Sequence, residues 1–283
     1  MLDLARVRAI VYDLDGTVYD DTHHFDLYAR KIQSYLPADL QERYLQEYEA
    51  VVAGRHGALR VGTFYDVERD LVLEVKGGRV RRALHWDGAE VQSPAVQSAY
   101  PEAVVPDQVK LINVGDLWWV PPTIALHYGG NREHNRAAFL EIRELMATPA
   151  FTMNPIAGLA DVVAALKGKV VQVLATNSPQ PDSEAILAKI GLIDLLDRKF
   201  YSSQKPVGLP AILNQIVADY NLPMESILSV GDNLANEIAP ARALGCQAVY
   251  LDPHNTADDD AADLVVRSMR AFLPTLRQLA GSR

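Results

Sequence analysis

Polar residues that could carry chemistry follow four apolar runs of the sequence. They are Asp13 and Asp15 after VRAIVY, Thr176 and Asn177 after VVQVLA, Lys205 soon after KFYSS, and Asp232 after ILSVG. Carboxylates combined with one lysine and one hydroxyl suit a divalent cation and a phosphoryl group, because Mg²⁺ prefers oxygen ligands and shares its shell with water and substrate phosphate. These residue types therefore indicate phosphoryl chemistry with Mg²⁺ as the cofactor, provided that they meet in the fold.

A regular alternation of strands and helices would bring them together. The sequence predicts strands over 7–12, 170–175, 199–202, 227–230 and 247–251, and helices over 155–167, 182–190, 209–220 and 234–244. Short strands joined by helices of crossover length predict an α/β fold with a doubly wound, parallel, Rossmann-like sheet. The carboxyl ends of neighbouring strands in such a sheet share one crevice, so the four polar segments should converge there.

The first strand and the later alternation are separated by a long segment of different character. Within this segment the sequence predicts two helices over 26–52 with a break at Pro37, antiparallel strands over 69–75, 80–86 and 89–91, and a helix over 131–146. Residues 93–130 show no sustained period. We therefore expect a catalytic core over 1–19 and 150–283, with an α+β cap domain inserted over 20–149.

The polar segments also carry a resemblance to a known family. Asp13-Leu-Asp15-Gly-Thr17, Leu174-Ala-Thr176-Asn177, Lys205-Pro206 and the segment from Val230 to Glu237 resemble, in this order, the four motifs of the haloacid dehalogenase superfamily. The resemblance covers residues 7–19 and about 150–255, whereas the inserted cap matches only in position.

The resemblance implies a role for each matching residue. Asp13 would attack phosphorus to give an aspartyl-phosphate, and Asp15 would protonate the leaving oxygen and then activate water. Thr176, Asn177 and Lys205 would bind the phosphate. The metal ligands would be the Asp13 and Asp232 side chains, the Asp15 backbone carbonyl and, directly or through water, Glu237.

Glu237 departs from the pattern, because relatives of this type commonly carry aspartate at that place. The extra methylene of glutamate keeps the negative charge but changes how far the carboxylate extends. We expect this change to affect metal affinity rather than the type of reaction.

Composition narrows the classes of partner. The 283 residues predict two domains, and the net charge of −9 disfavours nucleic acid polymers and anionic membranes. The single cysteine, Cys246, cannot form an internal disulfide, and no signal peptide or apolar run of membrane-spanning length is visible. These features predict a cytoplasmic protein whose partner is a small phosphorylated metabolite.

The expected function is Mg²⁺-dependent hydrolysis of a phosphomonoester, possible substrates being a nucleotide or a sugar phosphate, with the cap closing over the site and selecting the substrate. A metal-independent 2-haloacid dehalogenase is the first alternative, although a halide leaving group needs no proton and Asp15 would then be superfluous. A phosphomutase and a non-catalytic module that binds a phosphorylated ligand are the others.

Overall fold

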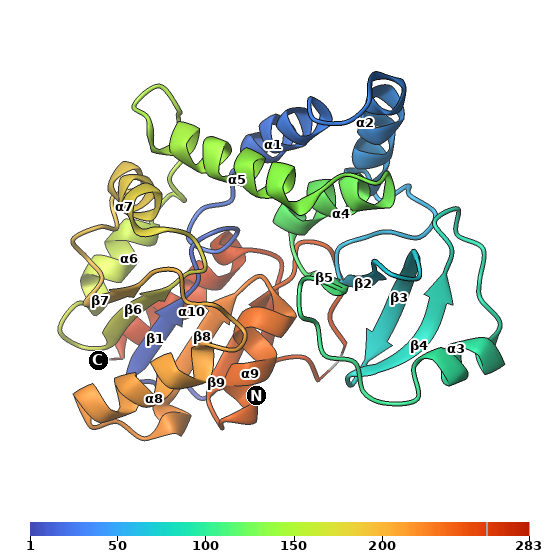
Figure 1. The fold of residues 1–283 in the computed structure, drawn as a ribbon. Coiled ribbons are helices and arrows are strands. Elements are labelled where there is room, and N and C mark those ends of the chain that lie inside the picture. The colour runs from blue at the N-terminus through green and yellow to red at the C-terminus, as the bar shows by residue number, and fades with distance from the viewer. Residues whose placement is uncertain (259, 283) are drawn as a thin grey trace. The chain divides into compact units, whose positions relative to one another are not determined.

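The computed structural model describes residues 1–258 and 260–282 (Figure 1). These residues group into two units, one of Met1–Asp21 together with Arg143–Arg283 and one of Thr22–Ile142. In the sequence, the second unit is thus an insertion into the first. We had placed that insertion at residues 20–149.

The short apolar runs form a six-stranded parallel sheet in the first unit. Its strands are β1 (Ala9–Tyr12), β6 (Val171–Ala175), β7 (Arg198–Phe200), β8 (Ile227–Gly231), β9 (Gln247–Leu251) and β10 (Leu264–Val266), in the order β10-β9-β8-β1-β6-β7. All neighbouring strands pair in parallel. Every residue of β1 is buried, as expected for a central strand covered on both faces. The predicted α/β fold with a doubly wound parallel sheet is confirmed.

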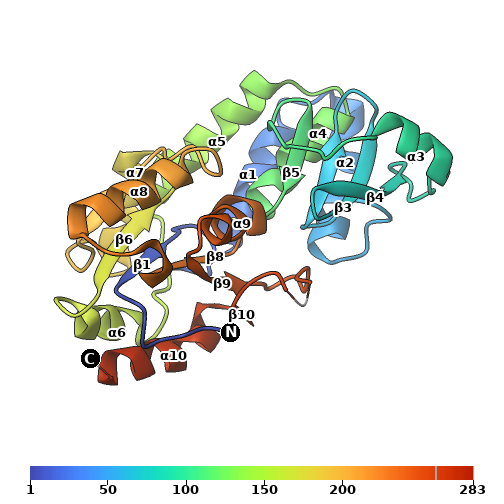
Figure 2. The same ribbon diagram turned by 90° about the horizontal axis from the view of Figure 1, so that it is seen from below.

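Helices cover both faces of this sheet. They are α6 (Leu159–Leu166), α7 (Gln180–Lys189), α8 (Leu209–Tyr220), α9 (Ala239–Ala243) and α10 (Met269–Gly281). Figure 2 shows α6 and α10 on one face and α8 and α9 on the other. The helix expected over 234–244 is divided into a π-helical turn at Leu234–Ile238 and α9. Pro240 lies at this junction, and its missing N–H removes one hydrogen bond of a continuous α-helix.

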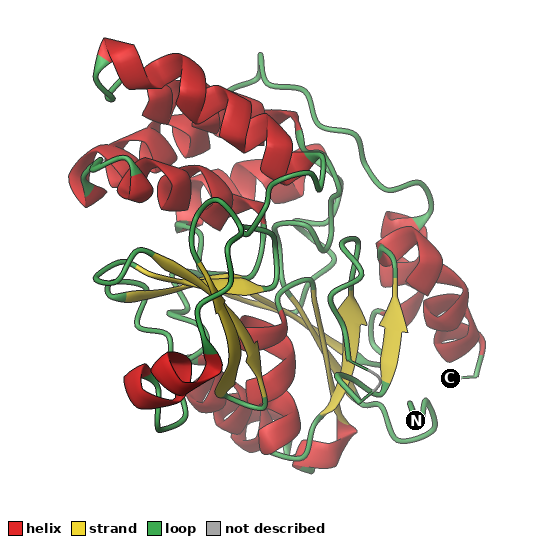
Figure 3. Cartoon of the chain, turned by 90° about the vertical axis from the view of Figure 1, so that its right-hand side faces the viewer, coloured by secondary structure: helices red, strands yellow, loops and turns green. Residues whose placement is uncertain are grey.

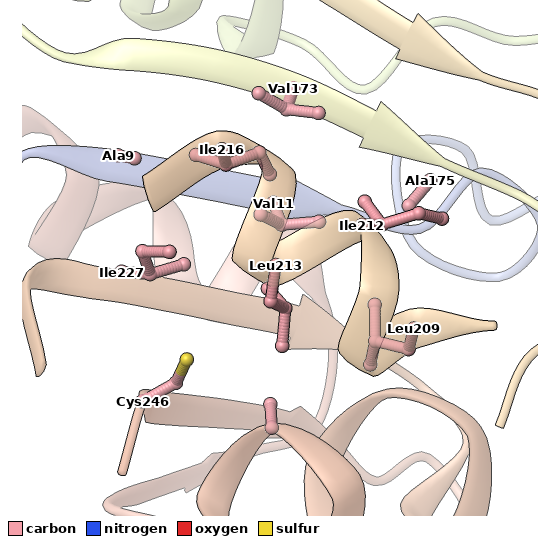
Figure 4. Close-up of a cluster of buried hydrophobic side chains, with 11 residues drawn as sticks. Ala9, Val11, Val173, Ala175, Leu209, Ile212, Leu213, Ile216, Ile227 and Cys246 are labelled. Carbon is pink, nitrogen blue, oxygen red and sulfur yellow. The ribbon is translucent and has the colours of Figure 1, made fainter. Parts of the chain in front are cut away.

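A buried apolar cluster joins the sheet to α8 and α9. Its side chains come from β1, β6, β8, α8, α9 and the residue before β9 (Figure 4). They are Ala9, Val11, Val173, Ala175, Leu209, Ile212, Leu213, Ile216, Ile227, Ala241 and Cys246. Burial raises the pKa of the Cys246 thiol to about 12, so this cysteine is an inert packing residue.

The second unit contains a four-stranded antiparallel sheet and helices. In Figure 3 the strands are yellow and the helices are red. Its strands are β2 (Thr63–Asp66), β3 (Leu71–Lys76), β4 (Arg79–Leu84) and β5 (Leu111–Val114), in the order β4-β3-β2-β5. Its helices are α1 (His23–Gln33), α2 (Ala38–Val52), α3 (Ser93–Ala99) and α4 (Val120–His127), with a 3₁₀ turn at Leu117–Trp119. Helix α5 (Arg132–Ala147) begins in this unit and ends in the first.

Sequence reasoning found part of this second unit. Pro37 separates α1 from α2 as predicted. The strand expected over 89–91 is reduced to a single bridge between Leu84 and Glu90. In the sheet, β3 lies between β4 and β2. None of the helices in the described part of the chain combines the length and apolar character needed to cross a membrane.

Candidate active site

The candidate site lies at the carboxyl ends of β1, β6 and β8, where the order of strands reverses direction. From β1 the chain proceeds outward through β6 and β7, and then through β8, β9 and β10 on the other side (Figure 1). The Asp13 N–H donates to the Val230 carbonyl at 3.0 Å, and the Thr176 N–H donates to the Phe200 carbonyl at 2.9 Å. These bonds extend the sheet by one residue and fix the backbone where each polar segment begins. Ligands of doubly wound sheets bind at such a reversal point.

Lys205 is held between two carboxylates. Its Nζ lies 2.5 Å from Asp13 Oδ1 and 2.6 Å from Glu237 Oε1, and all three side chains are buried. Burial raises the pKa of Asp13, although the Lys205 charge opposes this shift. Burial alone would lower the pKa of Lys205, but Asp13 and Glu237 raise it above its ordinary value. Lys205 is therefore a fixed cation beside the predicted nucleophile.

The Asn177 side chain fixes the backbone of Lys205. Asn177 Oδ1 accepts the Lys205 N–H at 2.7 Å, and Asn177 Nδ2 donates to the Lys205 carbonyl at 3.1 Å. Both polar groups of the Asn177 side chain are thus engaged with the Lys205 backbone, and phosphate binding by Asn177 stays a prediction. Thr176 is buried beside it, and its Oγ1 accepts the Ser178 N–H at 3.1 Å.

Three hydrogen-bond donors surround Asp15. Arg143 Nη1 lies 2.5 Å from Asp15 Oδ1, Tyr19 donates its hydroxyl to the same oxygen, and Ser178 Oγ donates to Oδ2 at 2.8 Å. Burial raises the pKa of Asp15, but the Arg143 charge and these hydrogen bonds outweigh it and lower the pKa below its usual range. The carboxylate is thus held ionised and in one orientation.

Sequence reasoning missed Arg143. It lies in the helix predicted over 131–146, where one arginine among many charged residues carries no evident chemistry. A signal was nonetheless present, because Arg143 falls eight residues after Asn135 on the stripe that also holds Ala138, Ile142 and Met146. A charged residue on a buried stripe requires a partner, and here the partners are Asp15 and Asp182.

The loop after β1 packs directly against the carboxylate after β8. Gly16 has a φ of +72°, and a Cβ at this position would lie 2.1 Å from Asp232 Oδ2. Only glycine leaves room for the Asp232 carboxylate at this place. The predicted ligands Asp13, Asp15 and Asp232 therefore come from two segments in direct contact.

Asp13, Asp15 and Asp232 fit a magnesium ion, because carboxylate and backbone carbonyl oxygens are the donors that Mg²⁺ prefers. Within residues 1–258 and 260–282, no three His, Cys, Asp or Glu side chains are grouped to hold a metal. The predicted site uses the Asp15 backbone carbonyl as well as the Asp13 and Asp232 side chains. Glu237 uses Oε1 for Lys205 and Oε2 for the Asn233 N–H at 3.0 Å. Both carboxylate oxygens of Glu237 are therefore engaged within the protein, and its role at the metal, directly or through water, stays a prediction.

Comparisons with known proteins agree with this architecture. A protein-family model described as haloacid dehalogenase-like hydrolase matches residues 7–245. A Haemophilus somnus 129PT protein with a predicted phosphoglycolate phosphatase activity superposes with a TM-score of 0.54 at 16% identity, over 96% of this chain and 99% of its own. No curated protein matches the sequence.

Two further solved structures align over the same shares of both chains, 96% and 99%. One is a Bacillus subtilis protein assigned as the HAD-hydrolase YfnB, crystallised with magnesium, with a TM-score of 0.49 and 15% identity. The other is a Thermotoga maritima protein assigned as a beta-phosphoglucomutase, with a TM-score of 0.47 and 17% identity. The 16% identity of the Haemophilus somnus protein shows similarity of fold alone.

Proposed function

The chain belongs to the haloacid dehalogenase-like hydrolases, and from this premise we propose that it is a Mg²⁺-dependent phosphatase of a small phosphorylated metabolite. The observation that supports this proposal most is the 2.5 Å contact between Lys205 Nζ and Asp13 Oδ1 at the reversal point of the sheet. A buried carboxylate with a fixed cation beside it suits attack on an anionic phosphoryl group, where charge must be offset. Nucleotides and sugar phosphates are the substrate classes that we propose first.

The first step transfers the phosphoryl group to the protein. A carboxylate oxygen of Asp13 forms a bond to phosphorus, and the bond from phosphorus to the substrate oxygen breaks. Binding of the negatively charged phosphate beside Asp15 favours protonation of this carboxyl, and Asp15 then donates that proton to the leaving oxygen. The Lys205 charge offsets the negative charge of the phosphoryl oxygens. When bound by Asp13 and Asp232, Mg²⁺ supplies further positive charge against the repulsion between the nucleophile and the phosphate.

The second step releases phosphate. Asp15 accepts a proton from water, the water oxygen bonds to phosphorus, and the bond from phosphorus to Asp13 breaks. Inorganic phosphate leaves, Asp15 releases the proton that it accepted, and both aspartates return to their starting states. Asp15 thus serves first as an acid and then as a base, which requires a fixed orientation in both steps.

Hydrolysis of 4-nitrophenyl phosphate with and without Mg²⁺ tests the proposal. The variant Asp13→Asn keeps the shape of the nucleophile and removes its charge. Asp20→Asn is the matched control, because Asp20 lies in the same loop but pairs with Arg270 at the surface. We expect activity that EDTA abolishes, a loss of about 10³-fold or more in Asp13→Asn, and little change in Asp20→Asn.

Other results would point to other functions. Halide release from 2-haloacids that EDTA does not affect would favour a dehalogenase. Transfer of the phosphoryl group to a sugar instead of water would favour a phosphomutase. Tight binding of a phosphorylated ligand with no turnover at any Mg²⁺ concentration would favour a binding module.

A further inference from the structure

The position of the Lys205 ammonium depends on the backbone that carries it. Its Nζ lies 2.5 Å from Asp13 Oδ1 and 2.6 Å from Glu237 Oε1. A lysine side chain is long and has many rotamers, so a shift of its backbone changes where the ammonium can lie. The loop that carries Lys205 therefore affects the distance between this cation and the predicted nucleophile.

The backbone just before Lys205 has an unfavourable conformation. Ser202 has a φ of +47° and Gln204 has a φ of +52°, which is left-handed backbone that residues with a Cβ seldom adopt. Such a conformation persists only where surrounding contacts hold it. We therefore expect the loop to relax, and Lys205 to move, when those contacts are lost.

The segment after β6 supplies the contacts that hold this loop. The Ser203 N–H donates to the Thr176 carbonyl at 2.9 Å. The Asn177 side chain accepts the Lys205 N–H at 2.7 Å and donates to the Lys205 carbonyl at 3.1 Å. One carboxamide thus binds both backbone polar groups of the residue that carries the cation.

From these contacts we propose that Asn177 is a positioning residue, which holds the Lys205 backbone so that Nζ lies beside Asp13. This inference rests on the proposed phosphatase function. It extends that function by giving Asn177 an effect on the reaction that passes through Lys205. A direct contact between Asn177 and the phosphate would act without Lys205, so the two roles can be separated.

Hydrogen exchange tests whether Asn177 holds the loop, and it requires no activity. Asn177→Ala removes both bonds to Lys205 and opens no cavity in the core, because Asn177 is exposed. We expect the backbone amides of residues 201–208 to exchange at least about tenfold faster than in the wild type, while those of α8 keep their rates. Asn214→Ala, at an exposed asparagine of α8, is the matched control and should leave the loop at its wild-type rate.

A double-mutant cycle tests whether the effect on the reaction passes through Lys205. Asn177→Ala should lower kcat/KM for 4-nitrophenyl phosphate by about tenfold, because the ammonium is misplaced. Lys205→Met has no ammonium to place, so adding Asn177→Ala to it should lower the remaining activity less than about twofold. A side chain that binds phosphate on its own would instead give losses that multiply.

The exchange measurement keeps the inference testable if Lys205→Met fails to fold or has no measurable activity, because it needs only Asn177→Ala. Loop amides that exchange at the wild-type rate, or losses that multiply in the double variant, would overturn the positioning role and leave the phosphatase proposal standing. A wild-type protein that does not hydrolyse 4-nitrophenyl phosphate with Mg²⁺ would instead contradict the proposed function on which the inference rests.

Discussion

The ammonium of Lys205 and the carboxylate of Glu237 lie 2.6 Å apart in the interior of the first unit. The Glu237 side chain is one methylene longer than aspartate, and its carboxylate reaches the lysine. Because Lys205 also contacts Asp13, Glu237 acts on the predicted nucleophile through a shared cation. Glu237 thus helps to place the positive charge beside Asp13.

Replacing Glu237 tests this arrangement. Glu237→Gln should lower kcat by about tenfold, because a charge-assisted hydrogen bond that fixes Lys205 becomes a weaker neutral one. The Mg²⁺ concentration for half-maximal activity should stay within about twofold of wild type, since the carboxylate contacts lysine. Titration of activity with Mg²⁺ measures both quantities.

Glu225→Gln is the matched control, because Glu225 is exposed in the turn before β8. It should change neither quantity. A tenfold rise in the half-saturating Mg²⁺ concentration of Glu237→Gln would show that Glu237 is a metal ligand after all.

Removing Lys205 should destabilise the protein. Lys205→Met leaves Asp13 and Glu237 buried without their cation, which costs about 3–5 kcal/mol in the free energy of unfolding at pH 7. Burial already raises the pKa of Asp13, and loss of the lysine raises it further. A carboxyl whose folded pKa exceeds its unfolded pKa destabilises when ionised, so the deficit should shrink as the pH falls from 7 towards 5.

Urea denaturation at several pH values measures this deficit. Lys169→Met, at an exposed lysine of the same unit, should remain within about 0.5 kcal/mol of wild type. A deficit that is independent of pH would contradict the assignment of the loss to unpaired carboxylates.

The contacts of Glu47 in α2 lead to a prediction about how the stability of the second unit depends on pH. It accepts hydrogen bonds from Tyr128 and Trp86, and His56 Nε2 lies 3.6 Å from its Oε2. Although burial raises the pKa of Glu47, these donors lower it to about 2. A lowered carboxyl pKa stabilises the fold above the ordinary value near 4.5, and this stability is lost as the pH falls towards 2.

We therefore expect Glu47→Gln to lower the free energy of unfolding by about 1 kcal/mol at pH 7, a modest value because solvent screens a partly exposed group. The difference from wild type should decrease between pH 4.5 and 2. All three tryptophans lie in the second unit, so their fluorescence reports its unfolding. Glu49→Gln, exposed on the same helix, should show no such effect.

The sequence predicted the parallel sheet well because both of its faces are covered. Central strands such as β1 and β8 then appear as continuous apolar runs that end at polar residues. The antiparallel sheet of the second unit gave a weaker signal. Its strands β2 and β5 have four residues each, and they are paired across more than forty positions of the chain.

Residues of the candidate site were predictable to the extent that they follow strands. Asp13, Thr176 and Asp232 take their positions from β1, β6 and β8, and the structure brings these strands side by side. Arg143 comes from a helix that is remote in the sequence, and its place on the buried stripe of that helix indicates that it needs a partner without identifying one. Its ion pairs with Asp15 and Asp182 depend on the packing of the whole unit, which no local pattern encodes.

Gly16 offers a direct test of the contact between the β1 loop and Asp232. In Gly16→Ala the new Cβ would overlap Asp232 Oδ2, so the carboxylate must move away from the loop. Because Asp232 is a proposed Mg²⁺ ligand, the half-saturating Mg²⁺ concentration should rise at least about tenfold, and kcat should fall.

Gly54→Ala is the matched control, because Gly54 has a similar φ of +67° and nothing within 4 Å of the added Cβ. Both variants should lose about 1 kcal/mol of stability from the left-handed backbone, but only Gly16→Ala should alter the Mg²⁺ dependence. An unchanged Mg²⁺ titration in Gly16→Ala would show that Asp232 does not hold the metal.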